Sequence, residues 1–183
     1  MPTFVFDMND SELRIARSGA DGADIAAQSI GFALIEDRAI RFGESALQQC
    51  RVHPRQVNNQ FWNRLSADPL AVRGPNAANH ADLVYRHFCE LVREAGVTAA
   101  DEFIIATPGT TTNEQLGLLL GITAEAGITV TGLVDNALGA SVVHPSPKRV
   151  LHIDVFLHRG VITELPEPTG SRGSAPRRSA SWV

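Results

Sequence analysis

Residues 103–134 contain two short β-branched segments on either side of a capped apolar segment. Residues 103–107 and 128–134 have the composition of buried strands. Between them, Thr111-Thr-Asn-Glu is a capping-box pattern, and Gly127 ends the apolar segment at about Ala126. A parallel pair of strands needs a long crossover connection, and a helix supplies one. We therefore expect the two strands to lie parallel in one sheet. This unit predicts an α/β domain and excludes an all-helical or all-β fold.

The first residues of the chain predict an antiparallel hairpin. Residues 3–7 form an apolar run that ends in an acid, and residues 11–17 alternate with Leu13 and Ile15 on one face. The Asn9-Asp10 pair between them supplies turn chemistry, and a second turn is expected at 19–24. We expect further strands at 29–35, 39–42 and 149–157. Hairpin strands followed by βα units predict an α/β domain on a mixed sheet.

Two further helices are expected, over residues 80–95 and 136–143. The first carries one apolar stripe and is followed by Gly96, a good helix terminator. Its two histidines, His80 and His87, lie two turns apart, and we expect both to be exposed. The stripe consists of Val84, Phe88, Leu91 and Val92.

The composition changes at Leu165. Residues 165–183 are rich in Pro, Gly, Ser and Arg and have almost nothing to bury, so we expect a disordered or non-native tail after one domain at 1–164. The net charge of −4 gives no reason to expect nucleic acid. No apolar run approaches the ~20 residues needed to span a bilayer, and the N-terminus lacks a secretory signal, so a cytoplasmic protein without membrane contact is expected.

Four segments, in order, resemble the nucleotide-binding domain of the heat-shock-70 (DnaK-like) chaperones, within the actin, hexokinase and chaperone superfamily. The segments are 4–16 (FVFDMNDSELRIA), 40–49 (IRFGESALQQ) with Pro54 and 61–65 (FWNRL), 103–109 (FIIATPG) with 133–140 (LVDNALGA), and 150–158 (VLHIDVFLH). The second of these resembles the family's GxxA…NP…F..KRL stretch, and the third resembles its VITVPA…IINEPTAAA unit. The fourth resembles the strand that carries DLGGGT.

The resemblance implies an actin-like ATPase (ribonuclease H-like) lobe that binds ATP and magnesium. It covers roughly residues 3–163 and implies only the first of the family's two lobes, so the chain is expected to be truncated. The metal is expected at Asp7 and Asp154, the acids that end two strands. The full set of expected cofactor-binding residues is Asp7, Asn9, Asp10, Ser11, Asn136 and Asp154.

The sequence departs from the family at both phosphate loops. Asn9-Asp10-Ser11 stands where the family has Gly-Thr-Thr, and Val155-Phe156-Leu157 where it has Gly-Gly-Gly. Glycines let backbone amides approach phosphate closely, whereas Val, Phe and Leu do not. Asp10 would also oppose phosphate charge, and Asn63 replaces a lysine. These changes predict weak or absent ATP hydrolysis, with no confident catalytic residue.

Three functions remain open at this point. The first is a degenerate heat-shock-70-like protein with a binding, scaffold or chaperone-like role toward an unidentified protein partner or client. The second is an active ATPase or sugar kinase of the actin-like superfamily, and the third is an unrelated α/β enzyme. Asp7 could instead cap a turn, and His152, Asp154 and His158 could together bind a metal. Self-association through an exposed cleft face is also expected.

Overall fold

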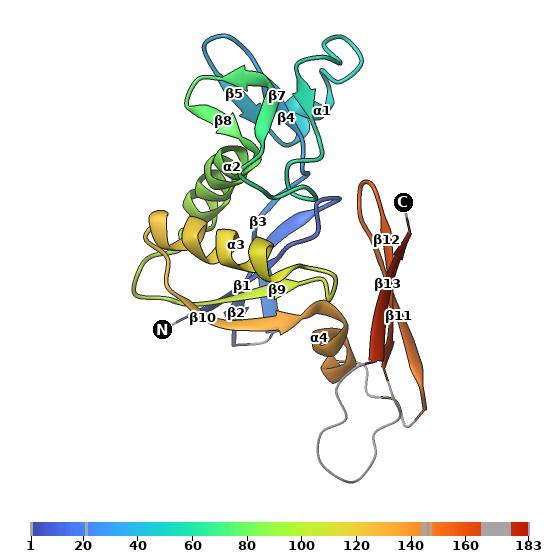
Figure 1. Ribbon diagram of the computed structural model, residues 1–183. Coiled ribbons are helices and arrows are strands. Elements are labelled where there is room, and N and C mark those ends of the chain that lie inside the picture. The colour runs from blue at the N-terminus through green and yellow to red at the C-terminus, as the bar shows by residue number, and fades with distance from the viewer. Residues whose placement is uncertain (1, 21, 144–145, 147, 166–176, 183) are drawn as a thin grey trace.

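The computed structural model describes the chain apart from residues 1, 21, 144–145, 147, 166–176 and 183 (Figure 1). Its largest sheet has five strands in the order β10-β9-β1-β2-β3. The strands are β1 (Thr3–Asp7), β2 (Leu13–Gly19), β3 (Gly22–Ser29), β9 (Glu102–Thr107) and β10 (Val130–Asp135). Strands from distant parts of the sequence therefore meet on β1, the central strand.

The pairing in this sheet is mixed. β1 pairs antiparallel with β2, with Phe6 opposite Ile15, and β2 pairs antiparallel with β3. On its other side β1 pairs parallel with β9, which pairs parallel with β10. The predicted α/β class, the hairpin and the strand-helix-strand unit are all confirmed. The predicted turn at residues 19–24 is tighter than expected, because β3 already begins at Gly22.

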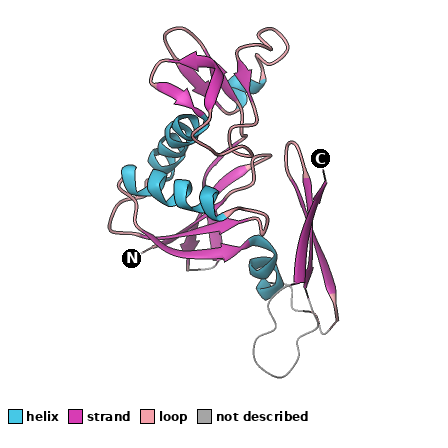
Figure 2. Cartoon of the chain, viewed as in Figure 1, coloured by secondary structure: helices cyan, strands magenta, loops and turns pink. Residues whose placement is uncertain are grey.

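Two helices pack beside this sheet and build the main core (Figure 2). α2 (His80–Ala95) ends at Gly96, which has φ 70°, and α3 (Asn113–Glu125) begins after Thr112. Both begin with a capping box, so their first amide groups are satisfied by side chains. Fully buried large side chains of the core come from β1, β2, β9, the two helices and segment 59–68. They include Phe6, Phe61, Phe88, Phe103, Leu13, Ile105 and Leu119.

Residues 33–79 form a smaller unit above the main sheet (Figure 1). It contains a three-stranded sheet in the order β5-β4-β6 and a hairpin of β7 and β8. The predicted strand at 29–35 is interrupted, because residues 30–32 lie between the end of β3 and the start of β4. The elements are β4 (Ala33–Ile35), β5 (Ile40–Phe42), α1 (Glu44–Leu47), β6 (Val57–Asn58), β7 (Pro69–Gly74) and β8 (Ala77–Asn79).

A separate three-stranded antiparallel sheet, in the order β11-β12-β13, follows helix α4 (Asn136–Val143) in the chain. Its strands are β11 (Val150–Val155), β12 (Gly160–Leu165) and β13 (Arg177–Trp182). β13 differs from the predicted disordered tail: its backbone pairs with β12, which otherwise would have an open edge. Residues 166–176 of that predicted tail lie outside the described residues.

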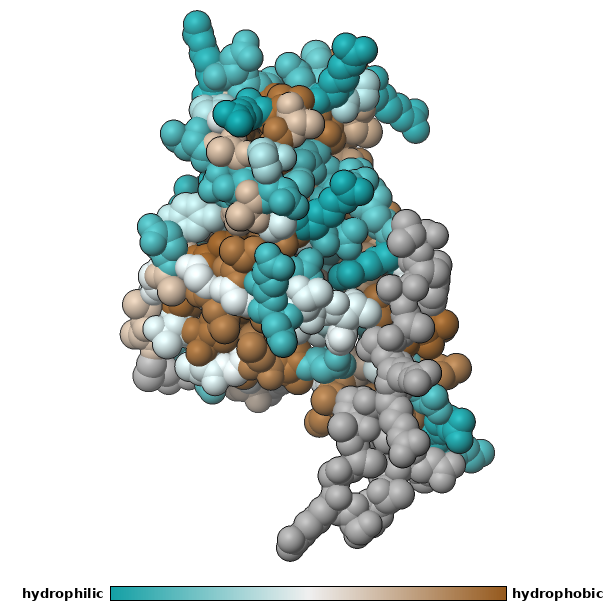
Figure 3. All heavy atoms as spheres, in the orientation of Figure 1, coloured by the Kyte–Doolittle hydropathy of each residue, from teal (hydrophilic) through white to brown (hydrophobic). Residues whose placement is uncertain are grey.

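One face of β11 is apolar and open. Leu151, Ile153 and Val155 alternate along the strand and are 61%, 58% and 66% exposed. Figure 3 shows apolar side chains on this side of the molecule, beside the grey residues. The opposite face holds His152 and Asp154, together with the buried Val161 and Thr163 of β12. In the described part of the chain, no helix is both long and apolar enough to cross a membrane.

Candidate functional site

Two carboxylates at the ends of strands in different sheets interact with one another. Asp7 is the last residue of β1, and Asp154 lies one residue before the end of β11. Burial raises the pKa of Asp7, and the negative charge of Asp154 raises it further, while Arg14 opposes both effects. Asp154 itself is held by His152, whose Nε2 lies 2.9 Å from its Oδ1. Asp7 and Asp154, the carboxylate pair, therefore lie close enough for the charge of Asp154 to act on Asp7, although they are far apart in the sequence.

Asn136, the first residue of α4, joins the carboxylate pair. Its Nδ2 donates to Oδ1 of Asp7 at 3.3 Å, whereas its buried Oδ1 has no hydrogen-bond partner among the described residues. One carboxylate oxygen of the neighbouring Asp135 is used elsewhere, because its Oδ1 accepts from the backbone amides of Ala137 and Leu138. Asp135 thus caps α4, and Asn136 remains the residue directed at the site.

The oxygen atoms of these residues suit a hydrated divalent cation. Magnesium takes oxygen ligands and is commonly held by one or two carboxylates and several waters. Asp7, Asp154 and the buried Oδ1 of Asn136, which has no hydrogen-bond partner among the described residues, supply such oxygens. Over the described ranges, no group of three or more His, Cys, Asp or Glu side chains forms a denser metal site.

The turn between β1 and β2 is hydrogen-bonded to the end of β11. Asn9 Nδ2 and Ser11 Oγ each donate to the carbonyl oxygen of Val155, both at 3.1 Å. The backbone amide of Leu157 donates to Oδ1 of Asp10 at 2.9 Å. We call these three contacts the turn latch. They join the two loops that the resemblance assigned to phosphate binding.

Asp10 is the centre of the turn latch. The residue is only 3% exposed, and its backbone carbonyl also accepts from the amide of Gly31 at 2.8 Å. Burial raises the pKa of Asp10, whereas the Leu157 amide, His158 and Arg159 lower it. Asp10 Oδ2 and Arg159 Nε are both buried without a hydrogen-bond partner within the described residues. The carboxylate therefore lies in a basic environment that is closed to solvent.

These loops do not fit the phosphates of a nucleotide. The Leu157 amide, which would have to bind an anion, already donates to Asp10. The neighbouring Phe156 is 6% exposed and stacks against the guanidinium of Arg159, 4.9 Å from the ring centroid. A phosphate group at this turn would displace a buried carboxylate and leave it without its amide partner, which costs about 1–3 kcal/mol.

The histidines of this region do not converge. His152 contacts Asp154, but His158 Nε2 donates to the carbonyl oxygen of Asn59 at 3.0 Å. Phe156, which lies between the two histidines in the sequence, is buried. The alternative metal site of His152, Asp154 and His158 is therefore not formed.

The prediction for His87 was wrong, because this residue is 2% exposed. His87 Nδ1 accepts from Nε1 of Trp62 at 3.1 Å, so its Nε2 carries the proton and donates to Oγ of Ser29 at 2.8 Å. The ring also stacks on Phe42, with centroids 4.7 Å apart. Its position three residues after Val84 and four before Leu91 places it on the apolar face, which was the available signal. His80, at the start of α2, is partly exposed.

Comparison with known proteins gave no match: no family description fits this chain, and no curated protein is similar to it.

Proposed function

We propose that this chain is the first lobe of an actin-like, heat-shock-70-type nucleotide-binding fold that acts as a binding or scaffold module with weak or absent ATP hydrolysis. Three arrangements support the fold. A hairpin opens the sheet, and a strand-helix-strand unit adds parallel strands to β1. A carboxylate lies at the end of β1, and another lies one residue before the end of β11. These are the arrangements that the resemblance implies for this superfamily.

The turn latch is the observation that carries the proposed loss of activity. Phosphoryl transfer depends on positioned donors that stabilise charge on the transferring group. Here the Leu157 amide donates to Asp10, and the side chains of Asn9 and Ser11 donate to Val155. These donors of both turns are therefore used within the protein. A role through surface contacts with a protein partner or client is compatible with this arrangement.

Calorimetric titration of ATP into the protein, with and without magnesium, tests this proposal. We expect no magnesium-dependent binding in the micromolar range and no phosphate release above the buffer rate. Asp154→Asn serves as a matched control, because it removes one member of the carboxylate pair and leaves the turn latch in place. Micromolar binding that requires magnesium and is lost in Asp154→Asn would contradict the proposal.

The carboxylate pair favours one alternative, an active ATPase or sugar kinase of the same superfamily. Asp7 and Asp154 supply the oxygen ligands for a cation, which would orient and neutralise phosphates when bound. The same titration decides between the two functions. Magnesium-dependent ATP binding accompanied by phosphate release, or by phosphate transfer to an added hexose, establishes the alternative.

A further inference from the structure

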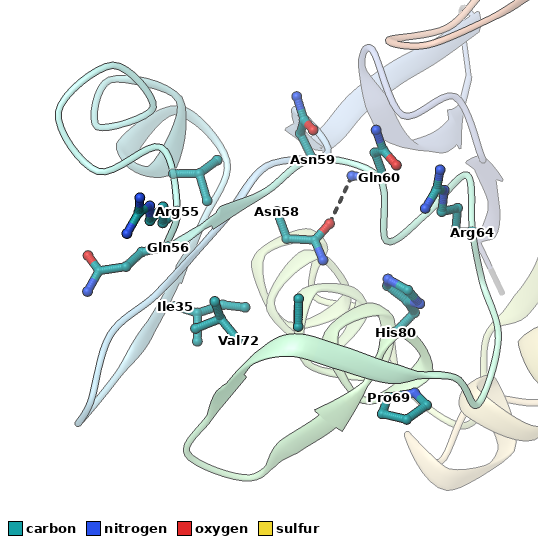
Figure 4. Close-up of a pocket in the computed structure, with 12 residues that line it drawn as sticks. Ile35, Arg55, Gln56, Asn58, Asn59, Gln60, Arg64, Pro69, Val72 and His80 are labelled. Carbon is teal, nitrogen blue, oxygen red and sulfur yellow. Dashed lines mark hydrogen bonds between the residues drawn. The ribbon is translucent and has the colours of Figure 1, made fainter. Parts of the chain in front are cut away.

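A cavity of about 360 Å³ lies in the smaller unit, outside the carboxylate pair and the turn latch. Segment 55–60 forms one side of it and β7 the other, and Ile35 of β4 and His80 of α2 contribute at its ends (Figure 4). Its size is in the lower part of the range for small-molecule sites. The wall has an apolar part, made by Ile35, Val57, Pro69, Ala71 and Val72.

The polar part of the wall is rich in donors. Its polar lining residues include Arg55, Arg64, His80 and Asn58. Gln56, Asn59 and Gln60 also line it, but Figure 4 shows their side chains directed away from β7. No Asp or Glu is among the lining residues. Neither arginine forms an ion pair within the described part of the chain. A wall with positive charge and no carboxylate favours an anionic ligand.

Asn58 is oriented for such a ligand. Its Oδ1 accepts from the backbone amide of Gln60 at 2.9 Å, which fixes the side chain and leaves Nδ2 without an acceptor among the described residues. Figure 4 shows Asn58 projecting from its segment toward β7, with His80 and Arg64 on one side of it and Arg55 on the other. Burial and the charge of Arg64 lower the pKa of His80, while Asp68 has the opposite effect. An anion beside His80 would offset the first two effects.

We propose that this cavity is a binding site for a small organic anion, a phosphate monoester or carboxylate attached to an apolar group. The anionic group is bound by Arg64, His80 and the Asn58 amide, and the apolar group packs on Ile35 and Val72. Because Asn59, in the same segment, accepts a hydrogen bond from His158, the site adjoins the turn between β11 and β12. The proposal does not depend on the proposed function, since its residues are separate from the carboxylate pair.

Titration of the full chain with phenyl phosphate, followed by NMR, tests the proposal. We expect saturable shifts at the Asn58 side-chain amide and the His80 ring, and a higher pKa for His80 in the complex. Inorganic phosphate, which lacks the apolar group, is expected to bind at least fivefold more weakly. Benzoate distinguishes the two anion classes: its binding relative to phenyl phosphate shows which anionic group the site prefers.

Matched arginine variants locate the site. Arg64→Gln is expected to weaken phenyl phosphate binding at least tenfold, because it removes a charged donor from the wall. Arg73→Gln changes an exposed arginine of β7 that does not line the cavity, and its affinity is expected to stay within twofold of the unmodified chain. Equal losses in both variants, no saturable binding, or shifts confined to the carboxylate pair would overturn the proposal.

Discussion

At the scale of single residues, His87 is a buried imidazole whose surroundings disfavour its protonated form. Burial lowers the pKa of His87 to about 3, whereas an unperturbed histidine has a pKa of 6.5. Protonation would require the Nδ1 atom, which accepts from Trp62, to become a donor. In the folded chain this imidazole is therefore neutral at pH values well above about 3.

The stability of the fold should consequently depend on pH below 6.5. The unfolded chain takes up a proton on His87 between pH 6.5 and about 3, while the folded chain does not, so the free energy of unfolding falls as the pH decreases through this window. Between pH 6.5 and about pH 5 the expected loss is about 2 kcal/mol. Urea unfolding of the unmodified chain and of His87→Gln at both pH values measures it. In His87→Gln this fall in the free energy of unfolding should be absent. In His53→Gln, a change at an exposed histidine, the fall should remain.

Sequence reasoning named the residues of the carboxylate pair and of the turn latch. It did not predict the contacts between them, nor the role of the Leu157 amide. Asp7, Asn136 and Asp154 were expected at one site, and the structure brings them together. Asp10 was expected to oppose a phosphate and is instead bonded to Leu157. That pairing joins distant segments of the chain, which no local pattern encodes. His87 was misjudged because histidine is usually polar and exposed, although its spacing fitted the apolar stripe.

At the scale of elements, prediction succeeded where local signals and burial agreed. β1, β2, α2 and α3 each have a periodic pattern with a turn or cap at their ends, so propensity and tertiary packing favour the same structure. β6, β7 and β8 have no such pattern. They are two to six residues long and are stabilised by pairing with other short strands, which sequence periodicity does not reveal.

Replacement of glycine by alanine should have opposite effects on stability at two positions, one in helix α3 and one between β3 and β4. Gly117, in α3, has open space where the methyl group of an alanine would lie, so Gly117→Ala should raise the free energy of unfolding by about 0.5–1 kcal/mol. At Gly31, between β3 and β4, the same methyl would lie 2.8 Å from the carbonyl oxygen of Asp10. Gly31→Ala should therefore destabilise the chain by distorting the turn latch. Urea midpoints of the two variants compare them directly, and equal effects would contradict this interpretation.

At the scale of the whole molecule, the open face of β11 should promote association between copies of the chain. Apolar patches of this kind are uncommon on monomers when the side chains are contiguous. Ile153→Thr keeps a β-branched side chain but removes apolar area, so it should weaken self-association roughly tenfold. Analytical ultracentrifugation over a concentration series measures this. Val52→Thr, at a position 67% exposed in the smaller unit, is the control and should have no effect.

The turn latch also has a mechanical consequence. In a two-part protein whose parts are joined by a ligand, the parts can pivot when the ligand leaves. Here Asn9, Asp10 and Ser11, in the turn after β1, form hydrogen bonds with Val155 at the end of β11 and with Leu157. These hydrogen bonds within the chain join the two sheets, so the contact between the sheets is made when the protein folds. The backbone proton of Leu157, although it lies in a turn, should exchange slowly with deuterium.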